Sequence, residues 1–151
     1  MASCTTDARK SNPASKDVRA FHTRARGVLK HPVVELTNAD TQTVGAAFAE
    51  AIRNRRYTCY ACAIMPDHVH LLIRKHRHSA EDMVAALQKA SGDALRRVWA
   101  ASGRGGHPVW GGPGWKVFLD CPDDVRRTID YIEQNPGKLR RPVQRWAFVR
   151  P

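Results

Sequence analysis

The stretch YTCYACAIMPDHVHLLI, residues 57–73, decides how this chain folds. Its first part is rich in Tyr, Cys, Ala and Ile, its last part resumes with Val, Leu and Ile, and Pro66-Asp67 between them favours a turn. The stretch therefore predicts a β-hairpin with strands over residues 57–65 and 68–73. His68 and His70 are expected on one face of the second strand and Val69 on the other, because side chains alternate along a strand.

Amphipathic helices are predicted on both sides of the hairpin. The first follows Asn38 and Asp40, either of which can cap a helix, and ends in a basic turn at residues 53–56. Its apolar positions are Val44, Ala47, Phe48, Ala51 and Ile52. The second begins at Ser79 with an acidic variant of the capping box and runs to about residue 100. One of its faces carries Val84, Leu87, Ser91, Leu95 and Val98, with Lys89 and Arg96 opposite.

The last third of the chain predicts a loop, a strand and a third helix. Residues 102–115 hold six of the ten glycines and form the loop, and WKVFL, residues 115–119, resembles a strand. Pro122 fits a first helical turn, and the helix is expected to stop near Asn135 because Pro136 follows. Residues 139–149 offer one more short strand. The order of elements predicts an α+β sandwich, an antiparallel sheet with helices on one face.

Length and composition predict one soluble domain. The chain has 151 residues, of which 42% are hydrophobic, and no apolar run approaches the roughly 20 residues that span a bilayer. Residues 1–17 are expected to form a flexible polar tail, and residues 18–151 a single domain. The N-terminus lacks the apolar core of a secretory signal, so the cytoplasm is the expected compartment and no membrane partner is expected.

Charge and cysteines narrow the class of partner. Lys and Arg number 25 against 14 Asp and Glu, a formal net charge of +11. This excess favours nucleic acid, because cations replace the counterions condensed on phosphates, although solubility alone is an alternative. Cys59 and Cys62 suggest a zinc or redox pair, but residues three apart on a strand point to opposite faces, so reduced thiols are expected.

Two features carry candidate chemistry. His68 and His70 could grip one metal ion from the rigid strand, or be two polar residues on a solvated face. In DVRRTIDYIEQNP, residues 124–136, the apolar stripe is Val125, Ile129 and Ile132. Tyr131 lies roughly 130° from the centre of that stripe, with Asn135 above it. A tyrosine that only packs over a neighbouring element is the alternative. A metal that polarises a phosphodiester, with a tyrosine as nucleophile, would make cutting and rejoining one reversible reaction.

MPDHVHLLI, residues 65–73, followed by YIEQNP, residues 131–136, resembles the single-tyrosine HUH transposases, in particular the REP-associated tyrosine transposase branch. The resemblance implies a ferredoxin-like fold and a catalytic domain that binds single-stranded or hairpin DNA. It implies that His68, His70 and Asn135 hold Mg²⁺ or Mn²⁺ and that Tyr131 forms a 5′-phosphotyrosine link. VLKHPVVEL, residues 28–36, is the candidate for the family's first strand.

Further residues are candidates for DNA contacts. Arg74, Lys75 and Arg77 follow the histidine strand together with His76 and His78, and Trp110 could stack on a base, whereas Trp115 is expected in the core. Lys89, Arg96 and Arg127 are the remaining basic candidates. Monomer and homodimer both remain open.

Two competing functions follow from the same residues. A histidine-triad hydrolase would need a third histidine where Leu72 stands. The other alternative is a hairpin-binding protein without cleavage activity, for example a truncated or domesticated transposase.

Overall fold

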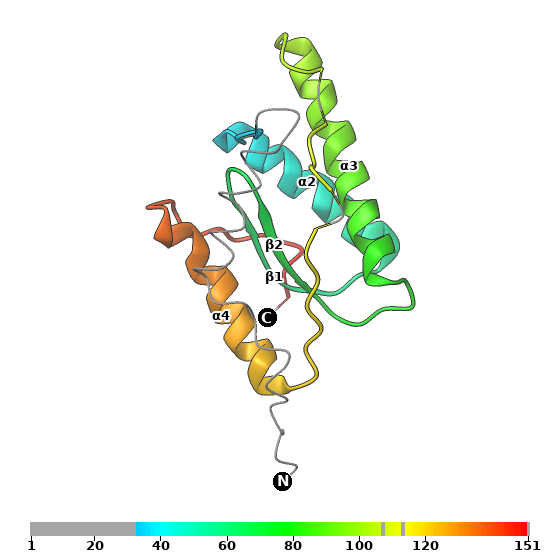
Figure 1. Ribbon diagram of the computed structural model, residues 1–151, viewed down its shortest axis with the longest axis vertical. Coiled ribbons are helices and arrows are strands. Elements are labelled where there is room, and N and C mark those ends of the chain that lie inside the picture. Colours follow the sequence, from blue (N-terminus) through cyan, green and yellow to red (C-terminus); the bar gives the residue numbers. More distant parts are fainter. Residues whose placement is uncertain (1–32, 107, 113, 151) are drawn as a thin grey trace.

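The computed structural model describes residues 33–106, 108–112 and 114–150. Figure 1 shows a two-stranded antiparallel hairpin between one helix on one side and a pair of helices on the other. The elements are α2 (Asn38–Arg55), β1 (Cys59–Ile64), β2 (Val69–Ile73), α3 (Ala80–Ala101) and α4 (Pro122–Lys138). The α+β class and the antiparallel sheet are as predicted. Expectations about residues 1–17 and 18–32 lie outside the described residues, and residues 33–36 form no strand.

The predicted hairpin is confirmed, with Pro66 and Asp67 in its turn. The backbone N–H of Met65 donates to the carbonyl oxygen of His68 at 2.8 Å, which closes the turn. His70 stands opposite Ala63 in the ladder. Because paired residues share a face of the sheet, these two side chains project to the same side.

The pleat of the hairpin separates two apolar clusters. One cluster joins the hairpin to α2 and α3, and its strand residues are Cys59, Cys62, Ile64, Val69, Leu71 and Ile73. The other joins the hairpin to α4, and it contains Ala61, Ala63, Met65, Leu72, Ile129, Tyr131 and Ile132. Helices therefore cover both faces of the hairpin, whereas the order of elements alone suggested one helical face. Because both faces are covered, the sequence of the hairpin is a nearly continuous run of apolar residues.

A β-bulge between Cys59 and Ala61 changes the alternation in β1. Cys59 and Cys62 consequently belong to the same cluster, although a regular strand would send them to opposite faces. Burial raises the pKa of the Cys59 thiol to about 12 and raises that of Cys62 well above its usual value. Both are free thiols, and their burial favours the protonated form, in agreement with the reduced thiols expected from the sequence.

Helix α2 begins with a full capping box. Its N-cap is Thr37 rather than either predicted candidate, Asn38 or Asp40, and Asp40 is the third residue of the helix. The Thr37 side chain accepts from the backbone N–H of Asp40 at 3.1 Å, and the Asp40 carboxylate accepts from the backbone N–H of Thr37 at 2.9 Å. Such reciprocal bonds satisfy N–H groups that a helix start leaves without partners.

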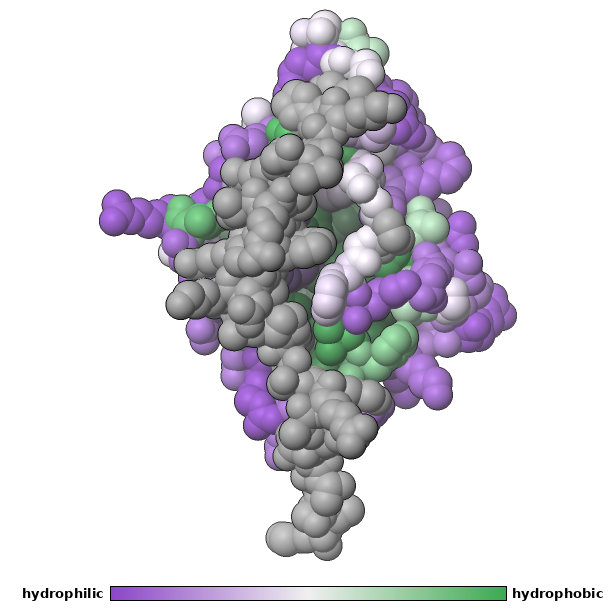
Figure 2. Space-filling model, in the orientation of Figure 1, coloured by the Kyte–Doolittle hydropathy of each residue, from purple (hydrophilic) through white to green (hydrophobic). Residues whose placement is uncertain are grey.

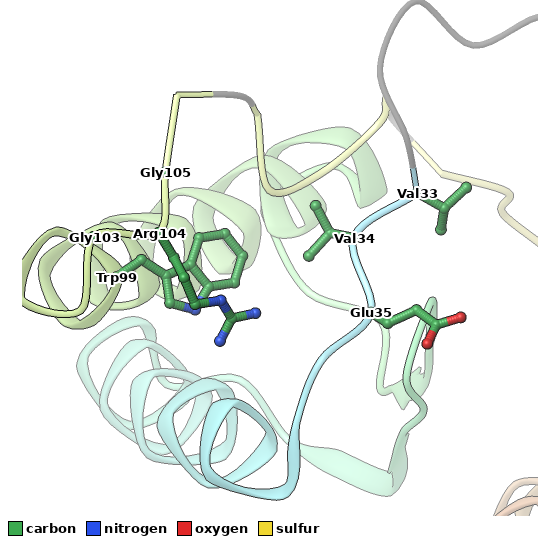
Figure 3. A pocket seen from close by; sticks show the side chains of 7 residues that line it. All are labelled: Val33, Val34, Glu35, Trp99, Gly103, Arg104 and Gly105. Carbon is green, nitrogen blue, oxygen red and sulfur yellow. The ribbon is translucent and has the colours of Figure 1, made fainter.

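Asp40 also connects α2 to the end of α3. Its carboxylate accepts from Trp99 Nε1 at 2.8 Å and from the Arg104 guanidinium at 3.1 Å, and Asp40 is only 2% exposed. Figure 3 shows Arg104 and Trp99 beside a hollow of about 330 Å³ that Val33, Val34, Glu35, Gly103 and Gly105 also line. A buried carboxylate with this many donors ties the two helices together.

Helix α3 has the predicted bounds to within one residue at its end, with Ser79 as its N-cap. Leu87, Ser91 and Leu95 are buried as predicted. Val98, however, is 46% exposed, and Trp99 is buried in its place. The Trp99 indole packs into the cluster and donates a hydrogen bond to Asp40. The larger side chain of Trp99 is therefore buried instead of that of Val98.

Two predictions for the last third are wrong. Residues 115–119 form no strand. Trp115 is 75% exposed and Phe118 is 67% exposed, so Trp115 is not a core residue. Helix α4 does not stop near Asn135 but continues to Lys138 with Pro136 inside it. Asn135 and Pro136 are buried, and this tertiary packing outweighs the local preference of the residue before a proline.

The C-terminal segment completes the outer edge of β1. The Gln144 side chain accepts from the backbone N–H of Ile64 at 2.8 Å and donates to its carbonyl at 2.7 Å. Val149 forms a single bridge with Cys59, in place of the predicted short strand. A side-chain amide thus satisfies an edge that a strand would otherwise cover.

No described helix is both long enough and apolar enough to cross a membrane.

We expect Asp40→Ala to lower the free energy of unfolding by about 3 kcal/mol, because a buried, multiply bonded charge is lost. Burial alone would raise the pKa of Asp40, but hydrogen bonds from Trp99, Thr37 and Arg104 outweigh it and lower the pKa below 3.8. The stabilisation that the Asp40 carboxylate contributes is therefore complete at pH values well above 3.8. It declines as the pH falls through the pKa of Asp40 in the folded protein. Urea unfolding at several pH values measures this, with the exposed Glu50→Ala as control. Equal losses in both variants would contradict the role of Asp40.

We expect Gly45→Ala to destabilise the fold by about 1–2 kcal/mol, despite the better helix propensity of alanine. A Cβ at Gly45 would lie 2.2 Å from the Trp146 ring, so the C-terminal segment must shift. Gly137→Ala in α4 meets nothing within 4 Å and should stabilise or be neutral. Thermal unfolding of the two variants compares them, and a stable Gly45→Ala would show that Trp146 does not pack there.

Candidate active site

His68 and His70 converge at the start of β2. His68 precedes the strand, His70 is its second residue, and their Nε2 atoms lie 3.0 Å apart. The rings are nearly perpendicular, with centroids separated by 4.7 Å. The predicted placement of both histidines on one side of the hairpin is therefore confirmed.

Asp67 in the turn orients the first histidine. Its Oδ1 lies 2.6 Å from His68 Nδ1, which is hydrogen-bonding distance for an N–H donating to a carboxylate. A proton held on Nδ1 leaves the lone pair of a neutral imidazole on Nε2, the atom that faces His70. Carboxylates commonly orient metal-ligating histidines in this way.

Tyr131 lies against His70 from the facing helix. The ring centroids are 5.7 Å apart and the rings are nearly perpendicular. On this face β1 presents Ala61 and Ala63, both fully buried, under Ile132 of α4. Such small side chains let a helix approach a strand closely, so the strand histidine and the helix tyrosine meet.

Asn135 is buried one turn after Tyr131. Its Nδ2 donates to the carbonyl oxygen of Tyr131 at 2.9 Å, and this bond orients the amide. The carbonyl oxygen Oδ1 of the side chain is then the atom left to accept or to ligate. At the end of the helix, Lys138 Nζ lies 4.2 Å from the centroid of the Tyr131 ring.

The donor set fits a divalent cation. Two ligands at about 2.1 Å from an octahedral ion and at right angles are separated by about 3.0 Å, which is the separation of the two Nε2 atoms. Within residues 33–106, 108–112 and 114–150 no three His, Cys, Asp or Glu side chains cluster as a metal site. Asn135, which is buried on α4, carries an amide oxygen, a type of ligand that divalent cations accept.

Of the predicted DNA-contact residues, Arg127 lies on α4 one turn before Tyr131, and the others lie on other segments of the chain. Arg74, Lys75 and Arg77 are exposed beyond the far end of β2. Lys89 and Arg96 lie on α3 and share the carboxylate of Asp93, at 2.8 and 2.5 Å.

The other two candidates are already engaged. Arg127 on α4 pairs with Asp124. Trp110 packs against the α2–α3 cluster and donates to Ser91 Oγ at 3.0 Å, which accounts for its position without a ligand.

Two hollows of the described surface lie away from this site. The one in Figure 3 is beside Trp99 and Arg104, and a second, of about 380 Å³, is lined by Arg55, His78, Asp82, Ala85, Ala86 and Lys89. Neither includes the histidine pair or Tyr131. On the face drawn in Figure 2, hydrophilic residues cover most of the described surface, and hydrophobic residues lie toward the lower centre.

Asp67 and Lys138 are the site residues that sequence reasoning missed. From the sequence Asp67 is expected only as a turn residue, although its position next to His68 is a signal for an orienting carboxylate. Lys138 follows Tyr131 by seven residues, two helical turns, so it shares a face with it. The expected stop at Asn135 concealed that relation.

The family model for IS200-like transposases matches residues 27–135, which is more than half of the chain. The matched range includes the histidine pair, Tyr131 and Asn135, and ends before Lys138. No curated protein and no solved structure matches the chain. Because the family match spans the hairpin and the tyrosine helix together, the chain belongs to the IS200-like transposase family.

Proposed function

We propose that this transposase is a metal-dependent enzyme that nicks and rejoins single-stranded DNA through a covalent link to Tyr131. The observation that carries the proposal is the contact between Tyr131 and His70, whose Nε2 lies 3.0 Å from that of His68. A nucleophile beside a pair of converging ligands is the arrangement that metal-assisted phosphoryl transfer needs. Membership of a transposase family supports DNA as the substrate.

The covalent step balances without an external energy source. The phenolic oxygen of Tyr131 attacks phosphorus in line, a P–O bond to tyrosine forms, and the bond between phosphorus and the 3′-oxygen breaks. The phenol loses its proton and the leaving oxygen gains one. The products are a 5′-phosphotyrosine and a free 3′-hydroxyl, and attack by a 3′-hydroxyl reverses the reaction.

His68, His70 and Asn135 are the residues that would hold Mg²⁺ or Mn²⁺. When bound there, the ion would polarise the phosphate and offset the charge that develops in the transition state. Two imidazoles favour Mn²⁺ and later metals, whereas Mg²⁺ prefers oxygen ligands. Asp67 orients His68 through the bond to Nδ1, and the bond from Asn135 Nδ2 to the Tyr131 carbonyl leaves the amide oxygen as the atom that can ligate.

The DNA would be held largely by charge. The chain carries a formal net charge of +11, and Arg74, Lys75 and Arg77 form an exposed basic run after β2. Hairpin-flanked target sites and the REP-associated branch belong to this proposal, as does a protein acting as monomer or homodimer in the cytoplasm. Lys89, Arg96, Arg127 and Trp110 remain secondary candidates, because each already has a partner within the protein.

We expect the wild-type protein to form a denaturation-resistant adduct with single-stranded hairpin oligonucleotides from its flanking genome when Mn²⁺ or Mg²⁺ is present. Oligonucleotides labelled at the 5′ or the 3′ end show which side of the cut stays attached, and the label 3′ to the cut should be retained. Tyr131→Phe should lose the adduct entirely while it keeps the fold, and chelation with EDTA should also abolish it.

Tyr60→Phe is the matched control, because it removes a phenol from β1 outside the site and should leave the adduct intact. Tight binding of the hairpins by the wild type without any adduct would sink the cleavage mechanism. The protein would then be a DNA-binding relative that lacks strand transfer.

We expect Asp67→Ala to weaken Mn²⁺ binding about tenfold or more, since the partner that orients a ligand histidine is lost. Titration followed by Mn²⁺ electron paramagnetic resonance measures this without DNA or turnover. Long-range ¹H–¹⁵N spectra of the metal-free protein should show the His68 proton on Nδ1 in the wild type and a mixture of tautomers in the variant. Glu50→Ala removes the same charge from α2 and should change neither result. Unchanged affinity and tautomer in Asp67→Ala would refute its positioning role.

A further inference from the structure

The end of α4 places a cation against the nucleophile. Helix α4 continues through Pro136 to Lys138, and the Lys138 ammonium lies 4.2 Å from the centre of the Tyr131 ring. His70 contacts the same ring, with centroids 5.7 Å apart. Tyr131 is therefore bordered both by a candidate metal ligand and by a positive charge.

Lys138 differs from the other cations of its helix. Arg126 and Arg127 pair with Asp123 and Asp124 one turn away, and their charge is thereby neutralised. Among the ion pairs of the described residues none involves Lys138, which is exposed. A lysine in a last turn also complements the helix dipole, but the dipole does not require the side chain to turn back over Tyr131.

We propose that Lys138 is a catalytic residue that binds a non-bridging oxygen of the scissile phosphate. This role rests on the function proposed above for Tyr131. A phosphate in line with the phenolic oxygen lies next to the ring, within reach of a flexible ammonium already held over it. The Lys138 ammonium donates a hydrogen bond to the phosphate oxygen and stabilises the charge that grows there as phosphorus becomes five-coordinate.

The elements that carry the site residues support this role for Lys138. His68 and His70 come from the hairpin, whereas Tyr131, Asn135 and Lys138 come from successive turns of one helix. Residues four and seven apart on a helix share a face. The backbone positions of the nucleophile, the amide and the lysine are thus set by a single rigid element, and the phosphate binds between that element and the hairpin.

The test measures single-turnover adduct formation on two versions of one hairpin oligonucleotide. One has an ordinary phosphodiester at the cut, and the other has a methylphosphonate, which replaces one charged oxygen by a methyl group, with the two isomers used separately. The proteins are wild type, Lys138→Met, Lys138→Arg and Arg53→Met. Arg53→Met removes one charge from the exposed end of α2 and is the control for net charge.

We expect Lys138→Met to slow adduct formation about 10- to 100-fold on the phosphodiester, because a charge-assisted hydrogen bond is lost. Lys138→Arg should recover most of the rate and Arg53→Met should react like the wild type. On one methylphosphonate isomer the wild type should be slowed while Lys138→Met loses less than about threefold more, because the shared interaction is already gone.

A loss under about threefold on the phosphodiester would overturn the role of Lys138, and so would equal losses on the phosphodiester and on both methylphosphonate isomers. Thermal unfolding of Lys138→Met checks the fold, and Lys138→Arg decides the question if that variant is unstable. A wild type that forms no adduct would instead overturn the function proposed for Tyr131, and the role of Lys138 with it.

Discussion

The rest of the structure depends on the alternation of side chains in the β1–β2 hairpin, which sends its apolar residues to two separate helical layers. Cys62, Ile64, Val69, Leu71 and Ile73 pack on the α2–α3 side, and Ala61, Ala63 and Leu72 pack on the α4 side. A hairpin of two strands has little stability by itself, so both layers are needed to hold it. His70 projects to the α4 side with Ala63, and the site is built where that layer begins.

Different contacts hold the helices of the two layers in place. On the α2–α3 side Asp40 joins the start of α2 to Trp99 and Arg104, so the two helices are oriented by a buried charge as well as by apolar contacts. On the α4 side the alanines of β1 leave room for the helix, and Ile132 fills that space. The outer edge of β1 is satisfied by the Gln144 side chain. The histidines and the tyrosine are thus carried by elements with buried anchors, which preorganises the site.

Most of the fold could be predicted from local patterns. The hairpin and the two capped helices follow from turn residues, caps and 3.6-residue periodicity, and the structure confirms them. Predictions failed where packing competed with a local rule. The bulge in β1 places Cys59 on the same face as Cys62, and Trp99 rather than Val98 occupies the buried face of α3. Helix α4 continues past Pro136 because Asn135 and Pro136 are buried. The segment with Trp115 had the composition of a strand but no partner strand beside it among the described residues.

The sequence by itself determined the identity of the candidate chemistry: two histidines two positions apart after a turn, a tyrosine on an amphipathic helix, and an asparagine one turn later. These relations are local, because alternation and helical periodicity place side chains without reference to the rest of the chain. Only the tertiary structure decided that the tyrosine meets His70, that Asp67 bonds to His68, and that Lys138 lies over the tyrosine ring. The meeting of hairpin and helix depends on packing between segments about 60 residues apart in the chain, and no local pattern specifies how closely two such elements approach.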